Sequence, residues 1–403
     1  MNSDEPIGII ELGNPNIKCL IFKINKNNDP EILSATVTPS GGIYNDVVMN
    51  LKKATESIRL SISSAEKEAK VSLKKINVIL EQPDFLCTKF SKHKKIDGSK
   101  IKRNDIEFLL KEAKKQLMLN DKNQSIIHIF NHNYTVDGKT FIEEPINVFA
   151  DSLMHEITFI TAPKNNLKNI NQIFLDCDIE IEKLISQTFA LGIELFDLKE
   201  LKSEVVLINL DFNKISLGLF KNLALIHSIT FPFGIDHITN DISKVCSLSS
   251  KESLAIRNNI DFLFNNNSNI FDEKNFLKED FFIDSKFRNI SKNLIFDIIK
   301  ARINEVLEII KKQLSLTGFN FNTGTNLYLT GQGVNLINIE KYFQNFLKLN
   351  TTIRKKNNID KNFLACFGAK KLINEGWETQ AIPEVKVKTI EKIGFLRKFF
   401  GNY

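Results

Sequence analysis

Two carboxylates next to polar turns are the side chains of this sequence that could take part in metal chemistry. Glu11 precedes the turn 13–16, and Asp211 opens the turn 211–214 after the apolar run 205–210. Carboxylate oxygens are ligands that Mg²⁺ prefers, so either residue could bind magnesium. A lone Glu and a lone Asp in turns are more often solvated, however, and no metal site is predicted from them.

The histidines and cysteines do not form a metal-binding or disulfide pattern. His128 and His132 are placed on predicted strands, where they do not share a metal-binding face, and we interpret them as half-buried histidines. The five cysteines are scattered, with no CxxC motif and no paired spacing. This usage favours a reduced compartment and no disulfide framework.

The two turns belong to segments that match each other without a gap. The first segment is IIELGNPNIKCLIF, residues 9–22, and the second is VVLINLDFNKISLGLF, residues 205–220. In this match Glu11 falls on Asn209. Each segment is predicted to be a β-hairpin, and two copies far apart in the chain indicate a duplicated α/β domain. A chance match between two hairpins is the alternative.

The composition allows a large folded protein and weighs against some functions. The chain has 403 residues, 42% of them hydrophobic and 25% charged, so it can bury the cores of two or more domains. A net charge of +6 is too small to indicate nucleic-acid binding. Asp4 and Glu5 stand where a signal peptide would be basic, and no apolar run approaches the roughly 20 residues that span a bilayer. We therefore expect a cytoplasmic protein.

Periodicity predicts the elements that surround the two hairpins. A helix capped by Asn45 or Asp46 follows the first hairpin, and a long amphipathic helix covers residues 289–316. A β-rich block, 76–162, is interpreted as an insertion between two parts of an α/β unit. Other helices are predicted at residues 166–174, 187–195, 236–245, 251–258, 337–347 and 365–372.

The inserted block is predicted to contain short strands and one helix. A polar stretch at 92–102 follows its first strand, and Asn104-Asp105 is predicted to cap a helix that runs to residue 117. The predicted strands cover residues 85–90, 126–130, 133–136 and 154–161.

The C-terminal segment has the pattern of a membrane-binding helix. Residues 377–388 contain Pro383 and show no periodicity, so they are predicted to be a linker. Residues 389–403 are predicted to form a helix whose apolar and basic side chains would contact a bilayer: Ile390, Ile393, Phe395, Leu396, Arg397, Lys398, Phe399 and Phe400. A Phe-rich helix with basic neighbours is typical of segments that insert into the interface of an anionic bilayer. The alternative is a helix that packs on its own domain.

Three loops and this C-terminal segment resemble a known family. The layout of actin-like ATPases comprises two hairpins, one at the start of each half, and a strand that ends in a glycine-rich loop before a helix. This sequence shows the same layout, and its third loop is Gly331-Gln332-Gly333. Within that superfamily the chain resembles FtsA, the bacterial division protein, over nearly its whole length. The resemblance is carried by ELGNPNIKCLI (11–21), Ser40-Gly41-Gly42, FPFGIDHITND (231–241), Leu329-Thr330-Gly331, the inserted block and the C-terminal segment.

The resemblance implies a domain organisation. The fold would be a duplicated, ribonuclease H-like α/β fold with two halves around a nucleotide cleft and an inserted FtsA-type β-rich subdomain. The implied ranges are 1–75 and 163–202 for the first half, 76–162 for the insertion, 203–235 and 321–376 for the second half, 236–320 for a partner-binding subdomain, 377–388 for the linker and 389–403 for the membrane helix.

The resemblance also assigns the positions that touch nucleotide in the family. Glycines there let backbone N–H groups approach phosphate oxygens, and carboxylates hold the water molecules of a magnesium ion. On this sequence those positions are Glu11, Gly13, Asn14, Asn16, Asn209, Asp211, Asn213, Arg257, Gly331 and Gly333.

Four of these elements depart from the family pattern. The second phosphate loop places the side chains of Phe212 and Lys214 where the family has glycines, and the first loop lacks the family's Thr/Ser and Lys. The adenosine loop has Gln332 between its glycines, and Arg257 occupies the nucleoside-contacting position. The resemblance implies ATP and magnesium as cofactors, whereas the loop residues predict that hydrolysis is absent and that ATP binding is weak or lost.

An FtsA-like chain would tie the filament protein FtsZ to the inner membrane. The FtsZ C-terminal peptide would bind subdomain 236–320, where Lys292, Asp297 and Arg302 are the expected contacts. Further expected partners are the anionic surface of the inner membrane on its cytoplasmic face at the division site, other copies of the chain and late division proteins. The alternative is an active actin-fold ATPase or kinase. Nucleic-acid binding has only diffuse lysines in its favour.

Overall fold

The structure of this chain is a computed structural model, and it describes residues 5–25, 29–265, 267–319, 327–348, 351–353 and 361–375. The chain forms two compact units. The described residues of unit 1 lie within 1–204, 218–229 and 356–403, and those of unit 2 lie within 205–217 and 230–355.

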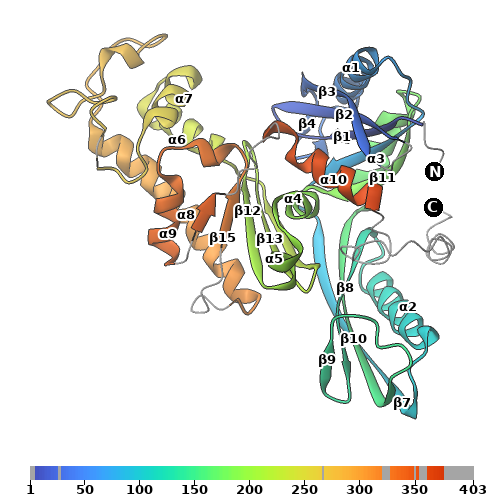
Figure 1. Cartoon of the computed structure of the whole chain (residues 1–403). Helices are drawn as coiled ribbons and strands as arrows, with labels where there is room; N and C mark the ends of the chain where they lie inside the picture. The colour runs from blue at the N-terminus through green and yellow to red at the C-terminus, as the bar shows by residue number, and fades with distance from the viewer. Residues whose placement is uncertain are drawn as a thin grey trace. The chain divides into compact units, whose positions relative to one another are not determined.

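Unit 1 is built on a five-stranded sheet with the strand order β11-β6-β1-β2-β3 (Figure 1). β1, β2 and β3 form an antiparallel meander, whereas β6 runs parallel to both β1 and β11. β1 and β6 are buried almost throughout, as expected of central strands covered on both faces. The strands are β1 Ile7–Glu11, β2 Asn16–Ile24, β3 Pro30–Pro39, β6 Lys75–Leu80 and β11 Glu180–Ser186.

Two pairs of helices pack on this sheet: α1 packs with α3, and α4 packs with α10. The apolar stripe of α1 faces the sheet, as its helical spacing predicts. The elements are the hairpin strands β4 Ile43–Tyr44 and β5 Val47–Val48, and the helices α1 Leu51–Ala69, α3 Lys164–Leu175, α4 Gln187–Leu195, the short α5 Leu198–Lys202, the 3-10 turn η3 Lys361–Phe363 and α10 Leu364–Glu375.

α1 begins later than the sequence predicts. Its N-cap is Asn50, whose side chain accepts a hydrogen bond from the backbone N–H of Lys53 at 3.0 Å. Asn45 and Asp46, the predicted caps, both have positive φ and lie in the β4–β5 turn. Asp46 is buried, and its carboxylate accepts a hydrogen bond from the backbone N–H of Glu81 at 2.7 Å. This remote partner, rather than a helix end, satisfies the Asp46 side chain.

α10 lies in unit 1, although the sequence analysis assigned its residues to the second half. It crosses α4 so closely that a Cβ atom on Gly368 would lie 1.8 Å from the carbonyl oxygen of Ala190. Lys371 of α10 forms an ion pair at 2.9 Å with Glu194, which is buried. The close approach and the ion pair hold the end of the described chain against unit 1.

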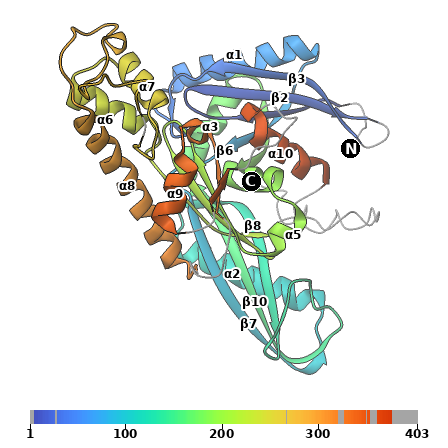
Figure 2. The ribbon, with the colours of Figure 1, turned by 60° about the vertical axis from the view of Figure 1, so that its left-hand side comes forward.

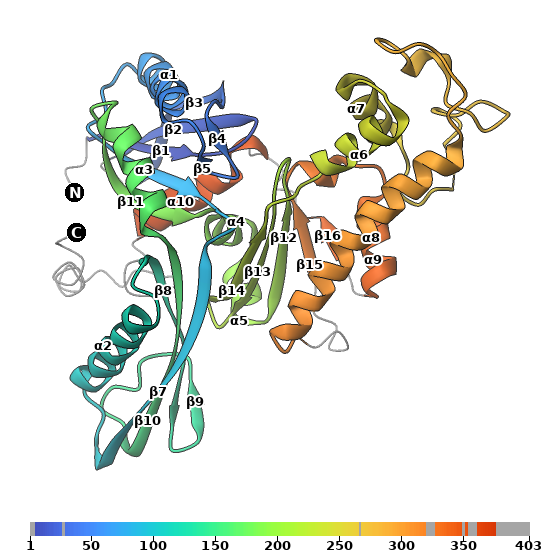
Figure 3. The same cartoon turned by 180° about the vertical axis from the view of Figure 1, so that it is seen from behind.

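The inserted block forms a four-stranded antiparallel sheet, β7-β10-β8-β9, with α2 on one face (Figure 3). α2 buries Ile106, Leu109, Ala113 and Leu117. Two predictions were wrong here: the strand predicted at 85–90 continues through the polar stretch to Lys100, and the two strands predicted at 126–130 and 133–136 are one strand. The elements are β7 Leu86–Lys100, α2 Arg103–Asn120, β8 Gln124–Val136, β9 Lys139–Phe141 and β10 Phe149–Pro163.

A second five-stranded sheet repeats the strand order of the first, as β14-β13-β12-β15-β16. β12 corresponds to β1, β13 and β14 to β2 and β3, and β15 and β16 to β6 and β11; β15 runs parallel to β12 and β16. This correspondence confirms the duplicated α/β fold that the two hairpins predicted. The strands are β12 Val205–Leu210, β13 Ile215–Lys221, β14 Ala224–Phe231, β15 Leu327–Thr330 and β16 Thr351–Ile353.

Helices and a long irregular segment complete unit 2. The long helix α8 packs against α6, and α6 packs against α7 (Figure 2). The buried residues of α8 recur at helical spacing, which is the pattern the sequence predicted. The elements are α6 Asp236–Cys246, α7 Ser250–Asn259, η1 Glu279–Phe281, α8 Lys292–Leu316, η2 Gln332–Asn335 and α9 Ile339–Leu347.

The predicted linker and membrane helix, 377–403, lie outside the residues that the structure describes. Among the helices it does describe, none is long and apolar enough to cross a bilayer.

Candidate functional site

Glu11 is held inside unit 1 rather than exposed at a turn. Glu11 is 3% exposed. One carboxylate oxygen, Oε1, accepts hydrogen bonds from Lys18 Nζ at 2.9 Å and from Gln187 Nε2 at 2.8 Å. The other, Oε2, accepts a weaker one from Cys366 Sγ at 3.7 Å. Burial, together with the charge of Glu11, raises the pKa of the Cys366 thiol well above its usual value, so the thiol remains a donor.

Sequence reasoning missed these three partners of Glu11. Lys18 lies directly across the first hairpin from Glu11 in the β1–β2 register, so counting from the turn could have found it. Gln187 is the first residue of α4, and Cys366 lies on α10. Neither carries a sequence signal, because only the packing of α4 and α10 in unit 1 brings them to Glu11.

The other assigned residues of the first loop shape the turn. A Cβ atom on Gly13 would lie 2.8 Å from the carbonyl oxygen of Asn16, so the turn has no room for a side chain there. Asn14 donates from Nδ2 to the carbonyl oxygen of Ile43 at 3.3 Å, and Asn16 is exposed at the start of β2. The backbone of this loop is therefore compact, and the side chain of Asn14 holds it to the β4–β5 hairpin.

The second turn is closed by its own hydrogen bonds. The backbone N–H of Asp211 donates to the carbonyl oxygen of Lys214 at 3.1 Å, and the N–H of Phe212 donates to Asp211 Oδ1 at 2.9 Å. Asn213 and Lys214 are buried, at 4% and 1% exposure. The carbonyl oxygens of Asp211 and Phe212 accept from the first N–H groups of the α6 region, at 3.1 and 2.9 Å. The N–H groups of Asp211 and Phe212, which could otherwise meet a phosphate, are thus already in use.

The glycines after β15 pack against the end of β12. A Cβ atom on Gly331 would lie 2.4 Å from Asn209 Oδ1, and one on Gly333 would lie 2.6 Å from the Cβ of Leu210. Gly331 also has φ +88°, which favours glycine. Asn209 is 3% exposed. Both glycines are therefore required by the packing of unit 2 itself.

Arg257 is buried within unit 2 and bound to its own neighbours. Its Nη1 donates to Thr239 Oγ1 at 2.9 Å and to the carbonyl oxygen of Ile235 at 3.3 Å, and its other nitrogens contact Asn258. Burial lowers the pKa of the guanidinium, partly offset by the charge of Asp236. In this position Arg257 ties α7 to the start of α6.

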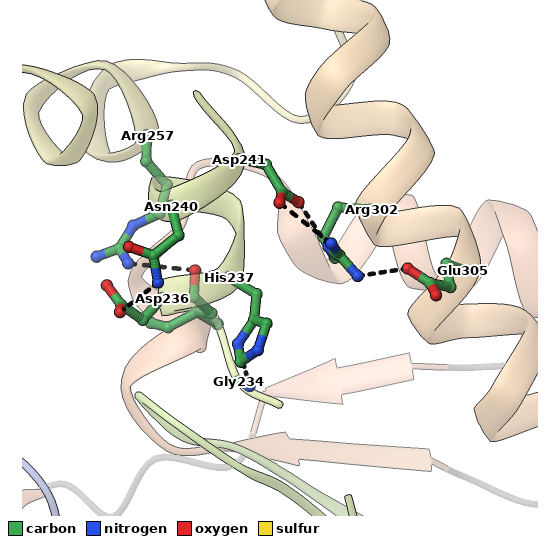
Figure 4. A network of polar contacts seen from close by, with 9 residues as sticks. Gly234, Asp236, His237, Asn240, Asp241, Arg257, Arg302 and Glu305 are labelled. Carbon is green, nitrogen blue, oxygen red and sulfur yellow. Dashed lines mark hydrogen bonds and ion pairs between the residues drawn. The ribbon is translucent and has the colours of Figure 1, made fainter. Parts of the chain in front are cut away.

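The three predicted FtsZ contacts point to different sides of α8. Steps of five residues turn a helix by about 140°, so Lys292, Asp297 and Arg302 cannot share one face. Asp297 is exposed, and Lys292 lies 5.3 Å from the ring centre of Phe296. Arg302 faces α6, where it donates two hydrogen bonds to Asp241, at 2.6 and 3.1 Å (Figure 4).

Three histidines of the inserted block, His128, His132 and His155, are buried and neutral. Burial lowers the pKa of His128 to about 3, of His132 to about 4 and of His155 to about 3. His128 Nε2 accepts a hydrogen bond from the backbone N–H of Ser186 at 2.9 Å, and His155 stacks on Tyr134 with ring centres 4.3 Å apart. Within the described ranges, no three His, Cys, Asp or Glu side chains are placed to hold a metal ion.

The residues present do not fit a magnesium–phosphate site well. Glu11 is already bound by a lysine, a glutamine and a thiol, and Asp211 accepts a hydrogen bond from its own turn. The cavity beneath the second turn, lined by Leu210, Ile215 and Ile238 among others, has a volume of about 10 Å³. Such a volume holds no more than one water molecule.

The repeated sheets and hairpins define an actin-like fold, and two solved structures share it. The PilM–PilN type IV pilus biogenesis complex matches with a TM-score of 0.60 at 11% identity, covering 91% of this chain and 96% of that chain. MreB5 of Spiroplasma citri bound to ADP matches with a TM-score of 0.54 at 12% identity, covering 94% of this chain and 100% of that one. At such identities the likeness establishes the fold.

The sequence comparisons narrow this class to one family. The SHS2 domain inserted in FTSA matches residues 86–161, the inserted sheet described above. The cell division protein FtsA of Agrobacterium fabrum is 22% identical over 364 residues, covering 86% of this chain and 80% of the relative. The FtsA of Buchnera aphidicola subsp. Schizaphis graminum is 24% identical (84% and 83% covered), and that of Bacillus subtilis is 22% identical (89% and 80%). The chain is a divergent relative of the FtsA cell division proteins.

Proposed function

We propose that this chain acts in cell division as an adaptor that ties FtsZ filaments to the cytoplasmic face of the inner membrane. The observation that carries the proposal is the combination of the FtsA-type SHS2 insertion with similarity to FtsA proteins over most of both chains. In this role the C-terminal segment binds lipid and unit 2 binds the FtsZ tail. Self-association and the recruitment of late division proteins belong to the same proposal.

We further propose that the chain does not hydrolyse ATP and binds it weakly if at all. Support comes from the two hairpin turns: the oxygens of Glu11 are occupied by three partners, and the second turn uses its own N–H and carbonyl groups. A phosphate would have to displace these contacts, and each charged hydrogen bond contributes on the order of 1.5–3 kcal/mol. The contacts that a phosphate would have to displace are the reason for preferring an adaptor over an active actin-fold ATPase.

Addition of Mg-ATP should leave the melting temperature nearly unchanged and produce no turnover above background. A ligand that binds only the folded state raises its stability by RT ln(1 + [L]/Kd), so a weak site gives a small shift. Differential scanning fluorimetry with and without Mg-ATP, and phosphate release from the same sample, measure both quantities. The Asp211→Ala variant serves as the control and should behave like the parent. Turnover that disappears in this variant would contradict the proposal.

The FtsZ tail is expected to bind along α8. The tail is expected to be acidic with apolar anchors, so its carboxylates can pair with Lys292, whose ammonium group lies over the buried ring of Phe296. Arg302 is held by Asp241 and Glu305, so its side chain contributes to the tail site only after leaving these partners. Lys292 is the contact that α8 offers without such a rearrangement, and Asp297 is exposed on another side of the helix.

Replacing Lys292 with glutamate should weaken binding of an FtsZ C-terminal peptide by about tenfold, because a like-charge contact replaces an attraction. Fluorescence anisotropy with a labelled peptide measures this change. Lys312→Glu, the same charge reversal at an exposed position near the end of α8, is the matched control and should leave the affinity unchanged. Equal affinities for Lys292→Glu, Asp297→Lys and the parent would place the peptide elsewhere.

The C-terminal segment is proposed to be the membrane anchor. Each basic residue near an anionic leaflet contributes about 1 kcal/mol, and each apolar side chain that inserts fully contributes roughly 1.5–3 kcal/mol. The rings of Phe395, Phe399 and Phe400 together with Leu396 should therefore dominate, while Arg397 and neighbouring lysines select anionic lipid.

Deleting residues 390–403 should release the protein from acidic vesicles while the melting temperature stays the same. Phe399→Asp combined with Phe400→Asp should have the same effect, and high salt should only weaken binding because buried rings are not screened. Vesicle co-sedimentation and a thermal melt of the same samples provide the measurement. A lower melting temperature after deletion would mean that the segment packs on its own domain.

A further inference from the structure

The sheet of the inserted domain has a long strand at its outer edge. β7 is the outermost strand in the order β7-β10-β8-β9, visible as the long blue strand in Figure 3. From Leu86 to Lys95 it pairs with β10 residue by residue, without a register shift. A straight edge of this length is unusual unless something pairs with it or protects it.

The stretch Lys89–Lys95, called here the β7 edge, has free backbone groups. In an antiparallel ladder every second residue directs its N–H and C=O away from the partner strand. Among the described residues, only β10 pairs with β7, and no backbone hydrogen bond from another segment reaches the β7 edge. Before it, Cys87 Sγ contacts the carbonyl oxygen of Ile226 at 3.9 Å. After it, Asp97 and Gly98 have positive φ, which ends the extended run.

The β7 edge is basic on both faces of the sheet. From Leu86 to Ile96 the strand carries four lysines and no acidic residue: Lys89, Lys92, Lys94 and Lys95. On the face of the sheet that α2 covers, Lys94 pairs with Asp105 at 2.7 Å. On the opposite face, called here the open side, Lys89 pairs with Glu156 at 3.5 Å. His93 and Lys95 are exposed on the open side, where alternate residues of the strand point.

We propose that the β7 edge binds an extended acidic segment of a partner protein, which adds to the sheet as a fifth strand. Main-chain hydrogen bonds to the free N–H and C=O groups supply affinity that does not depend on sequence. Lysines on both faces select carboxylates on both faces of the incoming strand, because opposite charges on neighbouring strands attract. The partner is thus a β-prone peptide with Glu or Asp on both faces.

The same charges make a second β7 edge an unfavourable occupant. Two β7 edges in antiparallel pairing would place lysines opposite lysines, and like charges directly across a ladder are destabilising. Lysines on edge strands are a known protection against such self-pairing. The β7 edge therefore disfavours pairing with another β7 edge and favours pairing with an acidic strand.

A ten-residue peptide that repeats Glu-Glu-Val-Val, and so carries Glu on both faces of the strand it forms, tests this surface with the full-length protein. It should bind, as measured by fluorescence anisotropy, and should slow amide hydrogen exchange at Lys89–Lys95. The Lys95→Glu variant should bind it about tenfold more weakly. Lys115→Glu, the same reversal at an exposed position on α2, should bind like the parent. The same peptide with N-methyl groups on the amides of one edge should lose binding, because it cannot complete the ladder.

Three outcomes would overturn the proposal. Equal affinity for a Thr-Val peptide would remove the charge selection, and binding without slowed exchange at Lys89–Lys95 would place the peptide elsewhere. An oligonucleotide that binds with the same dependence on Lys95 while the Glu-Val peptide does not would make this a polyanion surface. Thermal melts of the Lys95→Glu and Lys115→Glu variants, which should coincide with that of the parent, show that any loss of binding is not a loss of folding.

Discussion

Gly368→Ala should destabilise the protein by about 2–4 kcal/mol, although alanine is the better helix former by about 1 kcal/mol. The added Cβ atom would lie 1.8 Å from the carbonyl oxygen of Ala190 and 2.7 Å from its carbonyl carbon. Both are backbone atoms, so no side-chain rotation relieves the contact. α10 must move away from α4, and the ion pair between Lys371 and Glu194 must shift with it. Urea unfolding followed by circular dichroism measures the loss.

The control for this variant is Gly41→Ala. There the nearest atom to an added Cβ is the carbonyl oxygen of Lys53 at 3.6 Å, an ordinary contact. Gly41→Ala should therefore change the free energy of unfolding by well under 1 kcal/mol or increase it slightly through the unfolded state. A Gly368→Ala protein as stable as Gly41→Ala would show that α4 and α10 do not pack as closely as described.

Acidification from pH 7 to pH 4.5 should destabilise the protein steeply because three buried histidines must stay neutral in the folded state. Their folded pKa values are about 3 to 4, against an unfolded value near 6.5. Below about pH 6.5 the unfolded chain therefore binds more protons than the folded one, so the free energy of unfolding decreases as the pH is lowered. Each histidine adds about 1.4 kcal/mol per pH unit to the slope of the free energy of unfolding against pH, so the three together add about 4 kcal/mol per pH unit.

The variant His155→Phe isolates one of these contributions. The phenyl ring keeps the stack on Tyr134 and cannot be protonated, so the slope should fall by about 1.4 kcal/mol per pH unit. Urea unfolding at several pH values between 4.5 and 7 gives the slope. This range avoids Glu252, whose pKa of about 2 makes it lose stabilisation only at lower pH. His93→Gln, at an exposed position, should leave the slope unchanged; an unchanged slope in His155→Phe would mean that the His155 ring is solvated.

Sequence patterns were enough where the signal is local. The two hairpins needed only an apolar run, a polar turn and a second apolar run, and both turns fall where predicted. The spacing of buried residues in α8 likewise fixed its position. These elements follow from the alternation of side chains along a strand and their period along a helix, which a single sequence carries in full.

Residues with remote partners were beyond such patterns. Asp46 resembles a helix cap, but its carboxylate accepts from the N–H of Glu81, and no local feature reveals that. Arg257 matched a nucleoside-contacting position, yet its guanidinium is bound to Thr239 and Ile235 on the neighbouring helix. The polar stretch after Phe90 was not predicted to be a strand, because its lysines show no apolar alternation and only the ladder to β10 specifies the strand.

The return of α10 to unit 1 has a consequence for how the chain is made. A ribosome releases the N-terminal part of a protein first, at about 5–20 residues per second, and completed domains begin to fold while synthesis continues. Unit 1 cannot complete its fold at this early stage. Every residue of α4 is buried in the finished protein, and α10, which covers α4, is translated after unit 2. The apolar surface of α4 stays open for on the order of ten seconds on each nascent chain. Chaperones and proteases can reach this surface before release, and a message cut short within unit 2 yields a product in which α4 lacks its partner α10.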